Sequence, residues 1–125
     1  MPGRRYLSFL GNGHLSTARQ RQLLWEEHEA HYQWLQREEK LIRTELSRLN
    51  GESAQLETQR VQLQSATDSH SADGQPPPSC HTFMDTLQQR CSAFEAAVNR
   101  YKLRLRRWNQ ERDRFNAIDR IISRP

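Results

Sequence analysis

The sequence lacks any long apolar run. Among its 125 residues there is no stretch of about 18 apolar residues, which is the length that a membrane-spanning helix requires. The basic and partly apolar stretch Arg4–Leu10 is too short for a secretory signal peptide, and glycines interrupt the chain directly after it. We therefore expect a cytoplasmic protein that does not insert into a membrane.

Apolar residues and cysteines are also scarce. Hydrophobic residues make up 34% of the chain and the mean hydropathy is -1.00, which leaves too little apolar material for a thick globular core. Cys80 and Cys91 are expected to be reduced thiols in the cytosol, and a disulfide between them would require the chain to bend near Cys80. Because a thin seam between two helices needs much less apolar surface, the composition favours long exposed helices.

No catalytic or metal-binding pattern is recognisable. Gly11-Asn12-Gly13 lacks the strand and helix context of a phosphate-binding loop. His28 and His31 lie one helical turn apart, whereas a metal site would favour four-residue spacing or clustered Cys and His. We expect His28 to be tolerated at a seam, the other histidines to be solvated, and Cys91 to be a buried structural thiol. The sequence thus predicts no enzyme, no metal and no cofactor.

Proline is missing from two long stretches, and three consecutive prolines, Pro76–Pro78, separate them. Three prolines in a row cannot continue a helix. The expected divisions are a flexible N-terminal arm at 1–15, a first long helix at 16–66, a Pro-rich loop at 67–79, a second long helix at 80–122 and a tail at 123–125. Asn50-Gly51 is the point at which the first helix is most at risk of a break, because glycine costs about 1 kcal/mol relative to alanine inside a helix.

Apolar residues recur every seven positions on both sides of the prolines. In the first segment the series is Leu35, Ile42, Leu49, Leu56 and Leu63, with Trp25, Tyr32 and Leu46 as expected companions. In the second segment the series is Leu87, Phe94, Tyr101, Trp108, Phe115 and Ile122, with Met84, Cys91, Val98 and Leu105 as companions. Two narrow stripes of this period are typical of a coiled-coil seam.

The fold predicted from these stripes is an all-α, antiparallel coiled-coil hairpin of two long helices, in which each stripe covers the other. The rival architecture is an intermolecular bundle, in which each stripe faces a second copy. Polar residues fall on the expected companion positions at Glu39, Ser53, Arg60, Arg112 and Asp119.

Positive charge is concentrated in the second half. Residues 16–66 carry seven Lys or Arg and eight Asp or Glu, whereas residues 83–124 carry ten and five. The residues that we expect to bind a partner in this half include the arginines Arg100, Arg104, Arg107, Arg112 and Arg114. Trp34, off the stripe in the first segment, is expected to be exposed and to act as a binding anchor. An acidic protein surface is the favoured partner, with nucleic acid as the less favoured one.

The stretch Phe83-Met84-Asp85-Thr86-Leu87-Gln88-Gln89 and the basic run Lys102–Trp108 resemble the FliJ/YscO family of type III export stalk proteins, which serve flagella and injectisomes. The resemblance implies that paired helix ends dock in the hole of a hexameric export ATPase, at the periphery of a membrane secretion apparatus. It also implies contact of Phe83 and Leu87 with the export-gate protein, and in some members an escort role for secretion chaperones. The alternative is a generic coiled-coil scaffold that acts by oligomerisation.

Overall fold

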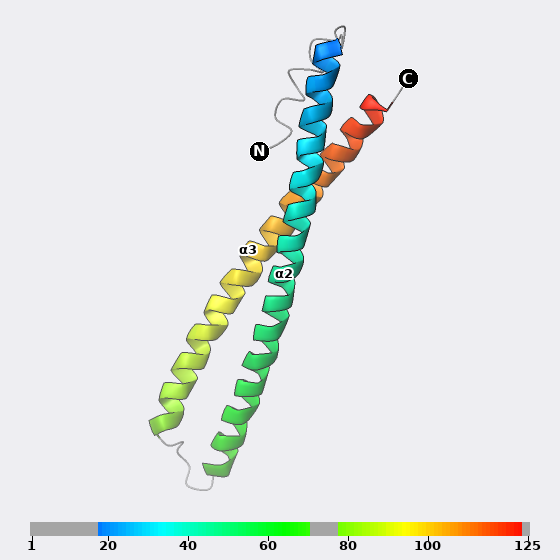
Figure 1. Ribbon diagram of the computed structural model, residues 1–125. Helices are drawn as coiled ribbons and strands as arrows, with labels where there is room; N and C mark the ends of the chain where they lie inside the picture. The colour runs from blue at the N-terminus through cyan, green and yellow to red at the C-terminus, as the bar shows by residue number, and fades with distance from the viewer. Residues whose placement is uncertain (1–17, 71–77, 124–125) are drawn as a thin grey trace. The chain divides into compact units, whose positions relative to one another are not determined.

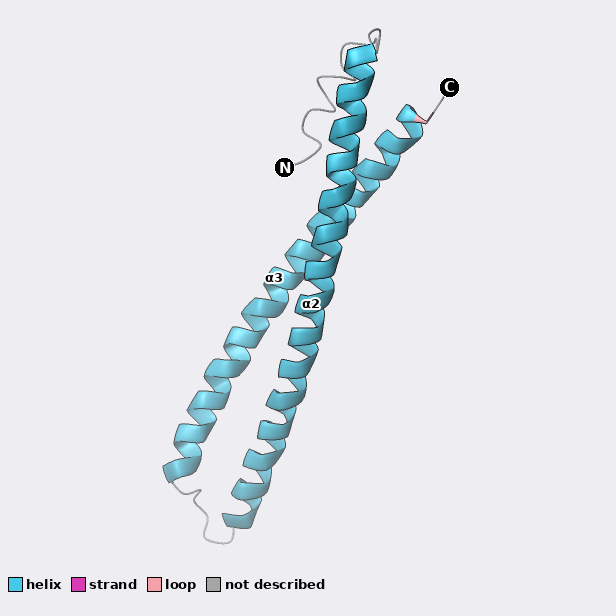
Figure 2. Ribbon diagram, in the orientation of Figure 1, coloured by secondary structure: helices cyan, strands magenta, loops and turns pink. Residues whose placement is uncertain are grey.

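Straight-chain residues without proline dominate both long segments, and each segment folds as one helix. The computed structural model describes residues 18–70 and 78–123, with helix α2 at Ala18–His70 and helix α3 at Pro78–Ile122. Within these ranges every residue but Ser123 is helical (Figure 2). The predicted arm at 1–15 lies outside the described residues, as do positions 71–77 of the predicted loop and the last two residues of the predicted tail.

The helices extend beyond their predicted bounds at the proline-rich side. α2 continues past residue 66 to His70, and the Ser69 hydroxyl donates a hydrogen bond to the Ser65 carbonyl at 2.8 Å. α3 begins at Pro78 rather than at residue 80. Proline is tolerated in the first turn of a helix because the N–H that it lacks would have no intrahelical partner.

α2 runs through Asn50-Gly51 without a break. Gly51 is exposed, and a Cβ built on it would meet no atom within 4 Å. The glycine therefore lies on the outer side of the helix. Its destabilising effect there comes from the conformational entropy that its backbone loses on folding, because no packing is lost at this position.

The packing of the chain divides it into two compact units, Met1–Ile42 with Arg104–Pro125, and Arg43–Leu103. We call the described part of the first the terminal unit and that of the second the middle unit. Each unit contains a segment of α2 packed against a segment of α3 (Figure 1). The predicted all-α fold, two long helices packed against each other, is therefore confirmed.

The first seven-residue series is confirmed as the buried stripe of α2. Leu35, Ile42, Leu49 and Leu56 are buried, and Leu63 is half-buried. In α3 Leu87 is buried and the other members of the predicted series are half-buried. The core is completed by residues outside both series, which are Leu24, Ala97 and Ile118.

The companion positions predicted for α2 are wrong by one residue. Trp25 is 53% exposed and Tyr32 43% exposed, and Leu46 is exposed as well. The inner companions lie three residues after each member of the stripe rather than four, and they are Glu38, Glu45, Glu52, Gln59 and Ala66; His31 lies in the same way three residues after the buried His28. Since all of these inner residues except Ala66 are polar, hydrophobic periodicity does not reveal them. Trp25, Tyr32 and Leu46, each one position further along the chain than an inner position, are apolar and therefore resemble seam residues in the sequence.

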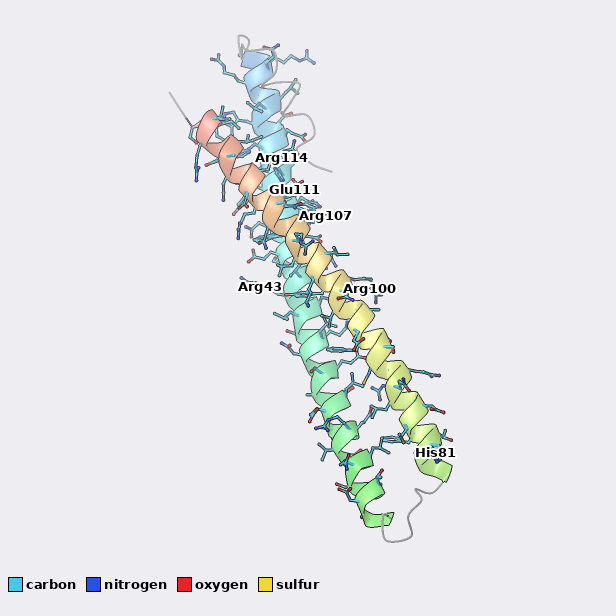
Figure 3. The ribbon with its side chains drawn as sticks, turned by 180° about the vertical axis from the view of Figure 1, so that it is seen from behind. Arg43, His81, Arg100, Arg107, Glu111 and Arg114 are labelled. Carbon is cyan, nitrogen blue, oxygen red and sulfur yellow. The ribbon has the colours of Figure 1, made fainter. Side chains whose placement is uncertain are left out.

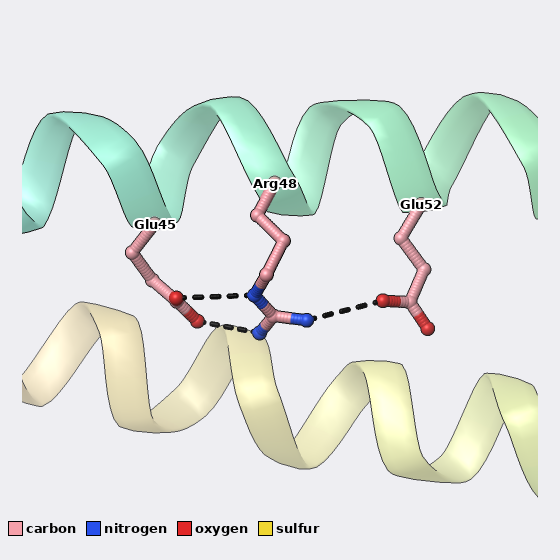
Figure 4. Close-up of polar contacts among 3 residues, drawn as sticks. All are labelled: Glu45, Arg48 and Glu52. Atoms are coloured by element: carbon pink, nitrogen blue, oxygen red, sulfur yellow. Dashed lines mark hydrogen bonds and ion pairs between the residues drawn. The ribbon is translucent and has the colours of Figure 1, made fainter.

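Two of these inner carboxylates, Glu45 and Glu52, are bridged along α2 by Arg48 (Figure 4). The Arg48 guanidinium donates to Glu45 through Nη2 at 2.6 Å and to Glu52 through Nη1 at 3.3 Å. The hydrogen bond and charge of Glu45 raise the pKa of Arg48, which remains protonated. Arg48 thereby compensates two acidic side chains at inner positions from within its own helix.

Candidate protein-binding surface

The middle of α3 carries a run of cations without any acidic residue between Glu95 and Glu111. Its members are Arg100, Lys102, Arg104, Arg106 and Arg107, and all but Arg104 are exposed. Arg100, Arg107 and Arg114 follow one another at seven-residue spacing along the helix (Figure 3). Seven residues correspond to about 10.5 Å of helix, nearly two full turns, so these three arginines form a row on one side of α3.

Arg104 pairs with a residue of the terminal unit and does not point into solvent as its neighbours do. Its Nε donates to Oε1 of Glu38 on α2, and Glu38 is half-buried. Because the carboxylate is partly removed from water, it depends on the guanidinium for compensation. Arg104 therefore holds α3 to α2, and is a poorer candidate for binding a partner than its exposed neighbours.

Arg112 and Arg114 also have partners within α3. The Arg112 guanidinium carbon lies 5.3 Å from the ring centroid of Trp108, a cation–π arrangement. The Trp108 ring is fixed in turn, because its Nε1 donates a hydrogen bond to the Leu35 carbonyl at 3.0 Å. Arg114 Nη1 lies 4.0 Å from Oε2 of Glu111. Both arginines thus contribute to the packing of the terminal unit.

Trp34 is half-buried, so its expected exposure is wrong. Its ring centroid lies 6.4 Å from that of His31, which is fully buried. The more exposed tryptophan of the terminal unit is Trp25. The reason is the shifted register: position 34 lies on the same side as the inner companions, and position 25 lies on the opposite side.

Phe83 and Leu87 differ in their environment within the middle unit. Phe83 is exposed, whereas Leu87 is buried against α2. Leu87 lines a groove of about 270 Å³ whose other lining residues are Ser53, Leu56, Glu57, Arg60, Cys91, Phe94 and Glu95. Cys91 is a free thiol of intermediate burial at this groove. Of the two residues implied in gate contact, only Phe83 lies on the surface.

The buried histidine pair is the feature of the terminal unit that sequence reasoning missed. His28 and His31 are both buried, so the expectation that His31 is solvated is wrong. His28 Nε2 lies 3.0 Å from Oδ1 of Asp119, and His31 Nε2 lies 3.0 Å from Oε2 of Glu111. The signal in the sequence was the spacing of positions 24, 28, 31 and 35, which places both histidines on the side of α2 that carries the stripe.

Neither a cluster of metal-ligating side chains nor a membrane-spanning helix occurs among the described residues. In residues 18–70 and 78–123 no group of three or more His, Cys, Asp or Glu could hold a metal ion. No helix in these ranges is long and apolar enough to cross a membrane.

Comparison of the chain with protein-family models, with curated proteins and with solved structures found no match. The family resemblance therefore rests on the residues quoted for it, and the function has to be argued from the surfaces of the helices.

Proposed function

We propose that this chain is a non-enzymatic helical binding protein that docks through the basic side of α3 onto an acidic surface of a partner protein. The observation that carries the proposal is the exposure of Arg100, Lys102, Arg106 and Arg107, which have no ion pair among the described residues. Leu103 lies within this run and is 61% exposed. A basic surface with an exposed apolar residue at its centre combines electrostatic attraction with an apolar contact.

The specific role that we propose is that of a stalk in a type III secretion system, with a hexameric export ATPase as the partner. Two long packed helices and a basic second helix support this proposal, together with the resemblance of residues 83–89 and 102–108 to the FliJ/YscO family. Phe83, exposed near the start of α3, is the residue that we assign to contact with the export-gate protein.

The proposal is tested by charge reversal on α3. The double variant Arg106→Glu with Arg107→Glu should weaken binding to a co-encoded hexameric ATPase by about tenfold or more, since like charges across an interface are strongly unfavourable. The matched control is Arg19→Glu with Arg21→Glu, which reverses two exposed charges on α2 and should change the dissociation constant less than threefold. Added salt should weaken the wild-type complex.

The stalk role also predicts an effect on the activity of the partner ATPase. Purified protein should raise the rate of ATP hydrolysis by that ATPase, and the α3 double variant should lose this stimulation. Absence of any binding would contradict the stalk proposal. Equal effects of the α2 and α3 variants would contradict the basic surface. If the chain instead binds nucleic acid tightly, with an affinity that falls steeply with added salt, nucleic acid rather than an acidic protein surface would be its partner.

A homo-oligomeric scaffold is the second candidate, and one observation favours it. Trp25 and Tyr32 are exposed seven residues apart on α2, and Leu46 is exposed fourteen residues further on, beyond Glu39. These exposed side chains are apolar surface that a second copy could cover. Sedimentation velocity over a wide concentration range separates the two candidates. A concentration-independent monomer of 14.8 kDa would exclude the scaffold, and a stable dimer would support it.

A further inference from the structure

The seam of the terminal unit contains two buried histidines where a coiled coil would ordinarily place aliphatic side chains. Phe115 of α3 contacts both rings: its centroid lies 4.1 Å from that of His28 in a stacked arrangement, and 5.5 Å from that of His31 edge-on. Both histidines therefore fill core space between α2 and α3.

The environments of the two histidines differ in their access to water. The His31 side chain is fully buried and its partner Glu111 is largely buried, whereas Asp119, the partner of His28, is half exposed. A charge on a side chain that water does not reach is costly unless it is fully compensated. Water therefore reaches the carboxylate beside His28, but hardly reaches the one beside His31.

The charged groups around His31 do not compensate for its burial. Glu111 of α3 favours a proton on His31, while Arg114 of α3 and His28 of its own helix oppose it. Desolvation is the largest effect, and the net result is a pKa of His31 below its usual value of 6.5. Neutral His31 is thus the form that fits the closed seam.

We propose that the terminal unit is a proton-sensitive clamp, in which uptake of a proton by His31 separates residues 18–42 from residues 104–122. In the open form His31 is hydrated and binds a proton with a pKa near 6.5. Because the closed form has the lower pKa, the open form binds more protons below about pH 6.5, and acidification favours opening. Above that pH the clamp stays closed and its stability no longer depends on this group.

The middle unit provides the internal reference. The residues of this unit that the structure describes as buried are leucines and an alanine, and His81 on α3 is exposed. Acidification over the same range therefore charges no described histidine in the seam of that unit, and its helix segments should stay together while those of the terminal unit separate.

Paired nitroxide labels on the full chain test the clamp. With Cys80 and Cys91 replaced by serine, one sample carries labels at Gln36 and Gln110, both exposed in the terminal unit. A second sample carries them at Ser47 and Asn99, both exposed in the middle unit. Between pH 7.5 and pH 5.0 the first distance should lengthen and broaden, and the second should not change. An unchanged terminal distance at pH 5.0 would overturn the proposal.

Two histidine variants assign the response to the correct residue. His31→Gln, which cannot take up a proton in this range, should keep the terminal labels close at both pH values, whereas His81→Gln should respond as wild type. If the labels on His31→Gln are already far apart at pH 7.5, the variant cannot report on the proton, and an NMR titration of His31 in the wild-type chain tests the proposal instead. Proton uptake below pH 6.5 that coincides with label separation supports the clamp, and uptake at or above pH 6.5 overturns it.

Discussion

Individual side chains link α2 and α3 of the terminal unit by specific pairing rather than by apolar contact alone. Glu38 and Arg104, His31 and Glu111, and His28 and Asp119 each join residues that are more than sixty positions apart in the sequence. Each pair places a carboxylate opposite a group that can donate to it. Such pairs add little net stability when both partners are present, but losing one partner is costly when the other stays buried.

The Glu38–Arg104 pair gives the first prediction at this scale. Arg104→Ala should lower the free energy of unfolding by about 1–2 kcal/mol, because the half-buried Glu38 carboxylate loses its counter-charge. The midpoint of urea denaturation, followed by circular dichroism, measures the change. Arg106→Ala removes an exposed guanidinium from the same helix and should alter stability by less than about 0.5 kcal/mol. Equal losses in the two variants would show that the pair contributes nothing specific.

Gly51 gives the second prediction. Gly51→Ala should raise the free energy of unfolding by about 1 kcal/mol, since the helix continues through this position and the added methyl group meets no atom within 4 Å. Thermal denaturation measures the effect. A destabilised variant would indicate that α2 is interrupted at Asn50-Gly51.

At the scale of the helices, the sequence predicts one side of the seam correctly and the other side incorrectly. Leu35, Ile42, Leu49 and Leu56 are apolar and buried, so their seven-residue period was sufficient. Most inner companions of α2 are polar, and the partners of His31, Glu38 and Gln59 lie on α3, which periodicity within one helix cannot report. The exposed Trp25 imitated a companion because hydrophobicity alone does not tell a seam residue from a surface aromatic.

The candidate binding residues divide in the same way. The exposure of Arg100 and Arg107 follows from their spacing relative to the α3 stripe, and the sequence was enough to predict it. The inward role of Arg104 required knowledge of Glu38, which lies on the other helix. Trp34 was misplaced with the register of α2. The sequence thus predicts whether a side chain is exposed when this depends on spacing within one helix. It does not predict it when the answer depends on how the two helices pair.

The buried stripe of α2 gives a prediction at this scale. Leu56→Ala should lower the free energy of unfolding by about 2–4 kcal/mol, because it removes a buried side chain that packs beside Leu87 at the α2–α3 groove. Leu41→Ala is the matched control, since Leu41 is 52% exposed and its truncation should cost well under 1 kcal/mol. A similar loss at both sites would contradict the stripe.

At the scale of the whole molecule, the central question is whether the two helices of one chain cover each other. The stripes of α2 and α3 are apolar, so each is stabilised when a partner helix covers it. The described contacts supply that partner within one chain, through Leu35 and Trp108 as well as the ion pairs. The rival arrangement, in which a second copy supplies the partner, would make helix pairing depend on protein concentration.

The most direct test is the distance between spin labels at positions 32 and 112 in a dilute sample at neutral pH. Both positions are exposed and lie in the terminal unit, on α2 and α3 respectively. If the helices of one chain pair with each other, the labels should lie close together, and an excess of unlabelled protein should leave the distance unchanged. Labels that stay far apart, or that separate on mixing with unlabelled chains, would contradict intramolecular pairing and remove the basis of the proposed stalk.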